Sequence, residues 1–140
     1  MDINTARDQG LELVNNSKAV MLGTIGKDGF PQIKALMNMK NDGLKEFWFS
    51  TNTSSKRVQC VKDDNRACVY FVDKDNFQGL MLKGTLEVLQ DIESRKMLWN
   101  DASKRFYPLG VEDPDYSVLH FVADKGNYYS NLENLDFTIE

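Results

Sequence analysis

The sequence predicts one mainly β domain over its 140 residues: an antiparallel sheet of six to eight strands, closed or partly open as a barrel, with two or three helices at its ends. Short turn sequences rich in glycine, asparagine and aspartate separate most apolar segments, which is typical of antiparallel hairpins. Strand-like segments also outnumber helical ones. Several strands are apolar on both faces, so we expect one face to fill the barrel and a symmetric partner chain to cover the other.

Alternating or continuous apolar runs mark the strands. They are expected at residues 19–25, 30–39, 47–51, 67–72, 78–89, 116–123, 127–131 and 136–139. The turns between strands are expected at Gly26-Lys27-Asp28-Gly29, Asn41-Asp42-Gly43, Lys74-Asp75-Asn76 and Asp124-Lys125-Gly126-Asn127, because these residue types tolerate the positive φ of tight turns. Pro31 favours an edge or the beginning of its strand, and Gly79 and Gly84 indicate bends or β-bulges in the long strand.

Apolar residues at helical spacing predict helices at 4–15, 54–62 and 91–104. Gly10 weakens the first helix because glycine has a low helix propensity. Asp91 has a side chain suited to capping the third helix. The segment that follows carries proline and glycine and is expected to form a loop.

Charge and composition exclude several classes of function. A net charge of −4 gives no general attraction to nucleic acid or to acidic membranes, so neither is an expected partner. No apolar run is long enough for a membrane span, and residues 1–16 lack the apolar core of a signal peptide. These features predict a cytoplasmic location.

The chain has two cysteines and one histidine. Cys60 and Cys68 are too few for an extracellular disulfide scaffold, so both are expected to be free, partly buried thiols. His120 has no cysteine or acidic cluster beside it in the sequence, and no metal site is predicted.

A candidate phosphate site lies where the aromatic strand at 47–51 runs into the next helix. Asn52, Thr53 and Ser54 have side chains that accept hydrogen bonds from the free N–H groups of a first helical turn, and Lys56 and Arg57 follow. Cations in a first turn oppose the helix dipole by about 0.3–1 kcal/mol each, and a bound anion would offset this. The alternative is a capped helix with a solvated basic first turn.

Several motifs in this order resemble one family. They are the hairpin Asp28-Gly29-Phe30-Pro31, the stretch from Phe47 to Arg57, Leu82-Lys83-Gly84, Trp99, Tyr107-Pro108-x-Gly110 and Asp113-Pro114-Asp115-Tyr116. Together they resemble the FMN-binding split-barrel family typified by pyridoxamine 5'-phosphate oxidase, and within it the general-stress-protein-like members. The resemblance covers nearly the whole chain.

The resemblance implies a homodimer with FMN at the subunit interface. It assigns cofactor binding to Lys34, Ala35, Leu36 and Met37 along one strand and to Ser50 and Thr51 at the end of the next. Ser55, Lys56 and Arg57 are assigned to the phosphate. Gln78, from the partner subunit, and Tyr129 are assigned to the surroundings of the flavin ring. The residue analysis and the resemblance agree on Lys56 and Arg57.

Two departures from the oxidase bear on function. Met39 stands where the oxidase carries a lysine for its substrate's phosphate, and no counterpart of its arginine-containing C-terminal segment follows the last strand. We therefore expect an FMN-dependent redox protein linked to stress, acting on a small molecule and lacking vitamin B6 oxidase activity. The alternatives are a flavin carrier or sensor without turnover, a split barrel that binds haem or a deazaflavin, and a structural dimer with an empty groove.

Overall fold

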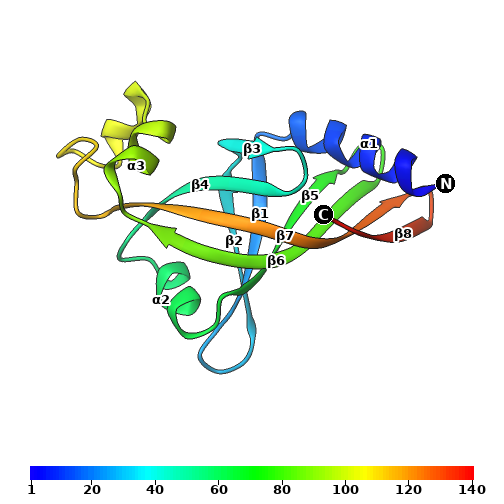
Figure 1. Ribbon diagram of the computed structural model, residues 1–140, viewed down its shortest axis with the longest axis horizontal. Helices are drawn as coiled ribbons and strands as arrows, with labels where there is room; N and C mark the ends of the chain where they lie inside the picture. Colours follow the sequence, from blue (N-terminus) through cyan, green and yellow to red (C-terminus); the bar gives the residue numbers. More distant parts are fainter.

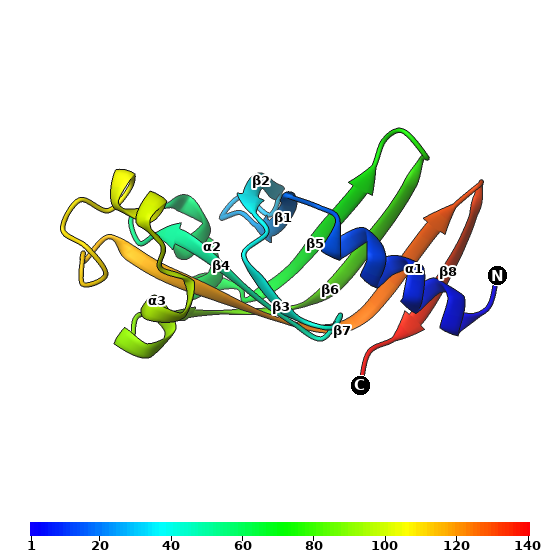
Figure 2. The same ribbon diagram turned by 90° about the horizontal axis from the view of Figure 1, so that it is seen from above.

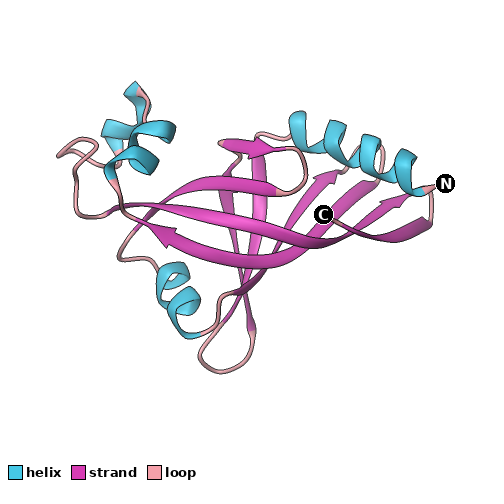
Figure 3. Ribbon diagram, viewed as in Figure 1, coloured by secondary structure: helices cyan, strands magenta, loops and turns pink.

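An eight-stranded antiparallel sheet, curled into a partly open barrel, forms the body of the protein (Figures 1 and 3). The computed structural model describes residues 1–140. The strands are β1 (Ala19–Ile25), β2 (Pro31–Met37), β3 (Lys40–Asp42), β4 (Glu46–Asn52), β5 (Arg66–Asp73), β6 (Gln78–Leu89), β7 (Tyr116–Ser130) and β8 (Glu133–Thr138). Their order is β2-β1-β5-β6-β7-β4-β3, with β8 also paired to β7. β2 contacts β4 without a hydrogen-bonded ladder, so the barrel is open at this seam. The predicted fold class is confirmed.

β7 is one continuous strand of 15 residues. The sequence predicted two strands joined by a hairpin turn at the Asp-Lys-Gly-Asn segment, and that prediction is wrong. Gly84 of β6 pairs with Ala123 and Lys83 pairs with Lys125, so Asp124 is the extra residue of a β-bulge. The turn-forming residues therefore bend the strand instead of reversing it.

The chain reverses direction further on, at Asn131 and Leu132. Both residues have a positive φ, 52° and 66°, which is the geometry of two-residue turns that match the twist of antiparallel strands.

A second difference concerns the turn predicted at Asn41-Asp42-Gly43. Its first two residues belong to the short strand β3, which pairs with β4, and the turn begins at Gly43.

α1 (Ile3–Asn15) lies across β5, β6, β7 and β8 (Figure 2). Asp2 caps it by accepting a hydrogen bond from the backbone N–H of Thr5 at 2.8 Å. Gly10 is buried against β6, where a Cβ would come within 3.2 Å of a side-chain carbon of Leu80. The residue that weakens the helix by propensity therefore lets the helix approach the sheet closely.

The other helices are α2 (Lys56–Asp63), α3 (Ile92–Leu98) and the 3₁₀ helix η1 (Asp101–Arg105). Asp91 caps α3 as predicted, but the single helix expected here ends early. Trp99 leaves the helix because its ring packs against those of Tyr107 and Tyr116, with centroids 6.5 and 5.4 Å away, and Asn100 then caps η1. None of these helices has the length and the apolar character needed to cross a membrane.

The main core fills the barrel. The ring of Phe47 lies 5.6 Å from that of Phe71 and 6.1 Å from that of Phe121, between centroids. A second, smaller cluster lies between α3, the loop that follows it and β7. Cys60 is buried and Cys68 is half-buried, and both are free thiols as predicted.

The outer face of β2, β1 and β5 is apolar and exposed. Its large side chains are Met21, Ile33, Met37, Tyr70 and Val72, with exposed fractions between 40% and 68%. Met21 and Tyr70 are paired across β1 and β5, so their side chains lie on the same face. An exposed apolar surface of this extent marks an interaction site in soluble proteins.

Candidate functional site

Ser55 organises the junction of β4 and α2. It is the N-cap of α2, and its hydroxyl accepts a hydrogen bond from the backbone N–H of Val58 at 3.3 Å. The residues expected to cap this helix are held elsewhere, because Ser54 N–H donates to a carboxylate oxygen of Asp115 at 2.9 Å and the hydroxyl of Thr53 bonds to the 113–117 segment. The helix therefore begins later than predicted, at the two basic residues.

The first turn of α2 presents unsatisfied donors. The backbone N–H groups of Lys56 and Arg57 have no acceptor in the protein, and no acidic side chain occupies this turn. These groups form the positive end of the helix dipole. Together with the Lys56 ammonium they form a site suited to an anion, which we call the α2 site and which comprises Thr51, Ser55, Lys56 and Arg57.

Arg57 is held in place without a counter-ion. Its Nε and Nη2 donate to the hydroxyl of Thr51 at 3.3 and 3.0 Å, and Nη2 also approaches the amide oxygen of Asn52 at 3.4 Å. No carboxylate pairs with it, and Nη1 has no acceptor in the protein. Burial lowers the pKa of Arg57, an effect that Tyr107 opposes. The guanidinium is thus oriented by neutral oxygens and keeps a free donor for a ligand.

Ser50 and Thr51 face opposite sides of β4, as neighbours on a strand must. Thr51 is buried on the side of α2, where its hydroxyl lies 3.5 Å from that of Ser55. The Ser50 hydroxyl is buried without a hydrogen-bond partner. Thr51 thus belongs to the α2 site by its side chain, whereas Ser50 adjoins it only through its backbone.

The predicted residues of β2 divide between the two faces of the strand. Lys34 and Leu36 pair in register with Leu22 and Val20 of β1, which point into the barrel, whereas Ala35 and Met37 lie on the exposed outer face. The Lys34 side chain is exposed and makes no hydrogen bond or ion pair. Nothing in one chain joins it directly to Arg57.

Gln78 begins β6 and Tyr129 lies near the end of β7. These strand ends lie at the other end of the sheet from α2 (Figure 1). Tyr129 packs edge-on against Phe77, with 6.2 Å between ring centroids. Gln78 lines a hollow of about 470 Å³ under α1, together with Glu12 and Asp73. A single chain therefore does not bring these two residues to the α2 site, and their predicted role requires a second copy.

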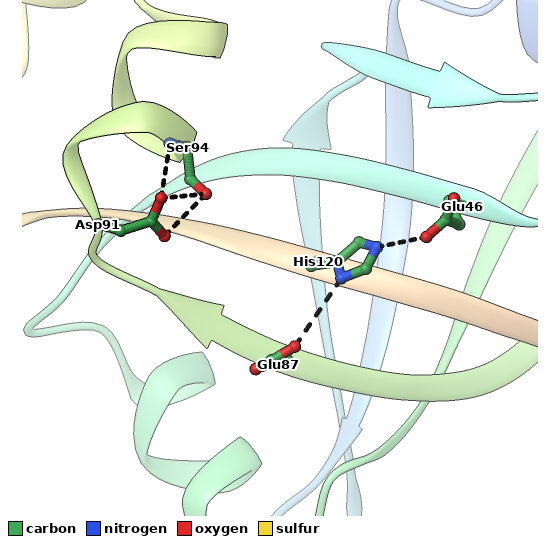
Figure 4. Close-up of polar contacts among 5 residues, drawn as sticks. All are labelled: Glu46, Glu87, Asp91, Ser94 and His120. Carbon is green, nitrogen blue, oxygen red and sulfur yellow. Dashed lines mark hydrogen bonds and ion pairs between the residues drawn. The ribbon is translucent and has the colours of Figure 1, made fainter.

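His120 lies in a polar cluster that its sequence neighbours did not indicate (Figure 4). Its Nε2 is 3.0 Å from a carboxylate oxygen of Glu46, and its Nδ1 is 3.9 Å from one of Glu87. Its ring stacks on that of Trp48 with centroids 4.9 Å apart. The two acids come from neighbouring strands, so only the strand order reveals them. Both ring nitrogens are engaged within the chain.

Tyr107 is a neighbour of the α2 site that residue-level reasoning missed. Burial raises the pKa of Tyr107 to about 12, helped by Tyr116 and Asp115 and opposed by the Arg57 guanidinium. In the sequence, the Tyr107-Pro108 motif points toward it only through the family resemblance.

The raised pKa of Tyr107 has a measurable consequence for stability. Because it exceeds the ordinary value of 10.0, the stabilisation from a neutral Tyr107 is complete below about pH 10 and is lost as the pH rises through about 12. We expect Tyr107→Phe to reduce the loss of unfolding free energy in this window, as measured by urea unfolding at a series of pH values. An equal loss in the variant and the parent protein would contradict this.

Comparisons with known proteins bear on this arrangement. The sequence profile of the family described as pyridoxamine 5'-phosphate oxidase like matches residues 6–140. The chain is similar to the crystal structure of a Clostridium acetobutylicum protein related to general stress protein 26 of B. subtilis, of the pyridoxinephosphate oxidase family. The two are 51% identical over 99% of this chain and 97% of that one, with a TM-score of 0.88.

Two more distant matches have other names. A haem-binding protein from Mycobacterium smegmatis shares the fold, with a TM-score of 0.78 and 15% identity over 95% of this chain and 57% of that one. The pyridoxine/pyridoxamine 5'-phosphate oxidase of Agrobacterium fabrum is 26% identical over 88 residues, which are 63% of this chain and 42% of the oxidase. The match thus spans less than half of that enzyme. With the profile matching from residue 6 to residue 140, the chain belongs to the pyridoxamine 5'-phosphate oxidase-like family.

Proposed function

We propose that the protein is a homodimeric FMN-binding redox protein whose α2 site holds the cofactor's phosphate. The observation that carries this is Arg57, a half-buried cation with no carboxylate partner, oriented by Thr51 beside two free backbone N–H groups. Charge-assisted hydrogen bonds of this kind are the strong ones in proteins. The donor set fits a phosphate monoester, and the name of the 51%-identical relative supports a role linked to stress.

Each residue of the α2 site has a different role in binding the phosphate. Arg57 and the first-turn N–H groups of α2 would hold the phosphate, and the exposed Lys56 would add charge at its rim. The Ser55 cap keeps the helix end in place. When bound, FMN supplies the hydride and electron chemistry, and the protein contributes binding and orientation. A cytoplasmic location stays a prediction, and so does action on a small molecule.

The homodimer is proposed from the exposed outer face of β2, β1 and β5. Met37 and Ala35 of the predicted flavin strand lie on this face, next to Met21 and Tyr70. A second copy on this face would cover Met21, Met37 and Tyr70 and offer its own Tyr129 to the cofactor. One such assembly would meet both requirements of the predicted site.

Vitamin B6 oxidase activity is not part of the proposal. Met39, at the position where the family's oxidase carries a lysine, packs against the second hydrophobic cluster. A phosphorylated substrate would lose there a charge-assisted bond of about 1.5–3 kcal/mol. The short match to the Agrobacterium oxidase gives no support to a shared substrate.

Haem is the second candidate, because a fold relative is named for binding it. A histidine axial ligand would have to come from His120, the only histidine. The ring of His120 lies between Glu46 and Glu87 and against Trp48, so it would have to abandon these contacts to reach iron. This favours FMN over haem.

One experiment tests cofactor and assembly together. We expect FMN mixed with the purified protein to co-elute from a size-exclusion column with a species of twice the chain mass, as read by visible absorbance and light scattering. Met21→Glu/Tyr70→Glu, which places two charges on the exposed face, should elute as a monomer with less flavin. Phe106→Glu, at an exposed aromatic outside the sheet, should change neither property. A dimer that retains haem or a deazaflavin but no FMN would overturn the cofactor assignment.

A further inference from the structure

The outer face of the sheet changes character along its strands. Beside the apolar rows, one row of cross-strand neighbours consists of Cys68 on β5, Lys83 on β6 and Lys125 on β7. Residues directly paired in an antiparallel sheet carry their side chains on the same face, with Cβ atoms roughly 4.5–5.5 Å apart. The register therefore places a thiol and two amines side by side.

This row forms part of a groove of about 500 Å³. One wall is apolar and comes from the β1–β2 hairpin, with Ile25, Pro31 and Ile33. The opposite wall carries Lys83 and Lys125. None of the residues of the α2 site lines it, so the groove is separate from the proposed phosphate site.

The positive charge of the groove is not neutralised within the chain. Lys83 and Lys125 face each other directly across β6 and β7, an arrangement of like charges that destabilises a sheet, and neither makes an ion pair. The third cation in the lining, Arg66, is bound to Asp64 at 2.7 Å. One carboxylate, Asp124, also lies in the lining. Lys83 and Lys125 carry two positive charges and Asp124 carries one negative charge, so the groove is attractive to an anion.

Cys68 is half-buried and forms part of the groove lining. Gly23 of β1 is paired with Cys68, and a Cβ at Gly23 would come within 2.9 Å of Sγ, so any other residue there would cover the thiol. Burial raises the pKa of Cys68, whereas the Gly23 backbone and the Lys83 ammonium oppose this. Cys68 is therefore a reporter that lies beside Lys83 and inside the groove.

We propose that this groove binds a small organic anion, an acid group carried on an apolar body. The acid group lies on Lys83 and Lys125, and the body lies over Cys68 against Pro31 and Ile33. The apolar wall favours an aliphatic or aromatic carboxylate over inorganic phosphate, because phosphate has no surface to bury there. The site is independent of FMN.

The reactivity of Cys68 tests the proposal. In a Cys60→Ala background, the Cys68 thiolate attacks one sulfur of an aromatic disulfide, forms a mixed disulfide and releases the other half as an absorbing thiolate or, for a pyridyl reagent, as the thione. We expect Lys83→Gln/Lys125→Gln to slow the dianionic 5,5'-dithiobis(2-nitrobenzoate) at least about tenfold relative to neutral 4,4'-dithiodipyridine. The neutral reagent corrects for any change in the thiol itself. Lys18→Gln/Lys104→Gln, with the same change in net charge elsewhere, should leave the ratio unchanged.

Protection identifies the ligand class. Octanoate or benzoate should slow the reaction of Cys68 with the neutral reagent, and inorganic phosphate at equal ionic strength should not. An unchanged ratio in the lysine variant, equal protection by phosphate, or no protection by either carboxylate would overturn the proposal. So would a Cys68 that reacts with neither reagent in the folded protein, because the groove would then be covered in the assembled form.

Discussion

Replacing Lys56 and Arg57 together with alanine is expected to weaken FMN binding more than a hundredfold, by at least about 3 kcal/mol. The variant loses two positive charges at the end of α2 and the free donor of a guanidinium that Thr51 already orients. Arg57 should account for the larger share, because it is half-buried whereas Lys56 is exposed and screened by water. The Ser55 cap remains, so the helix should still form.

Fluorescence titration of FMN into the variants measures this effect. Lys62→Ala is the matched control, because it removes one cation from the last turn of the same helix, away from the site. Its affinity should stay within about twofold of the parent protein, as expected for a screened surface charge. Undiminished affinity in a folded Lys56→Ala/Arg57→Ala protein would remove the phosphate from the α2 site, although the family assignment would stand.

Gly84→Ala is expected to lower the free energy of unfolding by at least about 3 kcal/mol. A Cβ at this position would overlap the backbone carbonyl oxygen of Val122, on the partner strand beside the bulge. Backbone held by a ladder on both sides cannot move aside as a side chain can. The substitution should therefore break the pairing of β6 with β7 around Asp124 or shift its register.

Gly79→Ala is the control for this substitution. A Cβ there would meet the hydroxyl end of the Tyr70 side chain, which can shift more easily than backbone, so we expect a smaller loss, below about 1 kcal/mol. Urea unfolding at one fixed protein concentration compares the two, because a dimer's stability depends on concentration. Equal losses for both variants would show that the bulge does not require glycine.

The sequence predicted the strands and helices well where one local signal acted alone. Asp91 marked the start of α3, and the aromatic run before Ser50 marked β4. The prediction failed where contacts with a distant segment outweighed the local signal. Asp124-Lys125-Gly126-Asn127 has the composition of a turn, yet pairing with β6 on one side and β8 on the other holds it in a strand. Trp99 suits a helix interior, yet two tyrosines from the following segment draw it out.

The candidate site followed the same rule. Thr51, Ser55, Lys56 and Arg57 are near one another in sequence, and one junction brings them together. Local reasoning predicted Lys56 and Arg57, whereas the resemblance assigned Thr51 and Ser55. Gln78 and Tyr129 belong to the other end of the sheet, and the resemblance alone assigned them. The acids around His120 and the row that contains Cys68 depend on the order of strands, which a pattern of residue types does not specify.

The length and position of β7 also affect how the chain is made. β4 pairs along its length with the first half of β7, β6 pairs with nearly all of it, and β8 with the second half. While the ribosome is still adding residues 116–130, β4 and β6 each lack a partner on one edge, and such open edges pair readily with other chains. Most strand pairs of the sheet form between strands that precede β7, but the β4 and β6 edges are joined into one sheet only when β7 pairs with both. A nascent chain therefore has to be kept from its neighbours until this late strand emerges, after which the sheet can complete in one cooperative step.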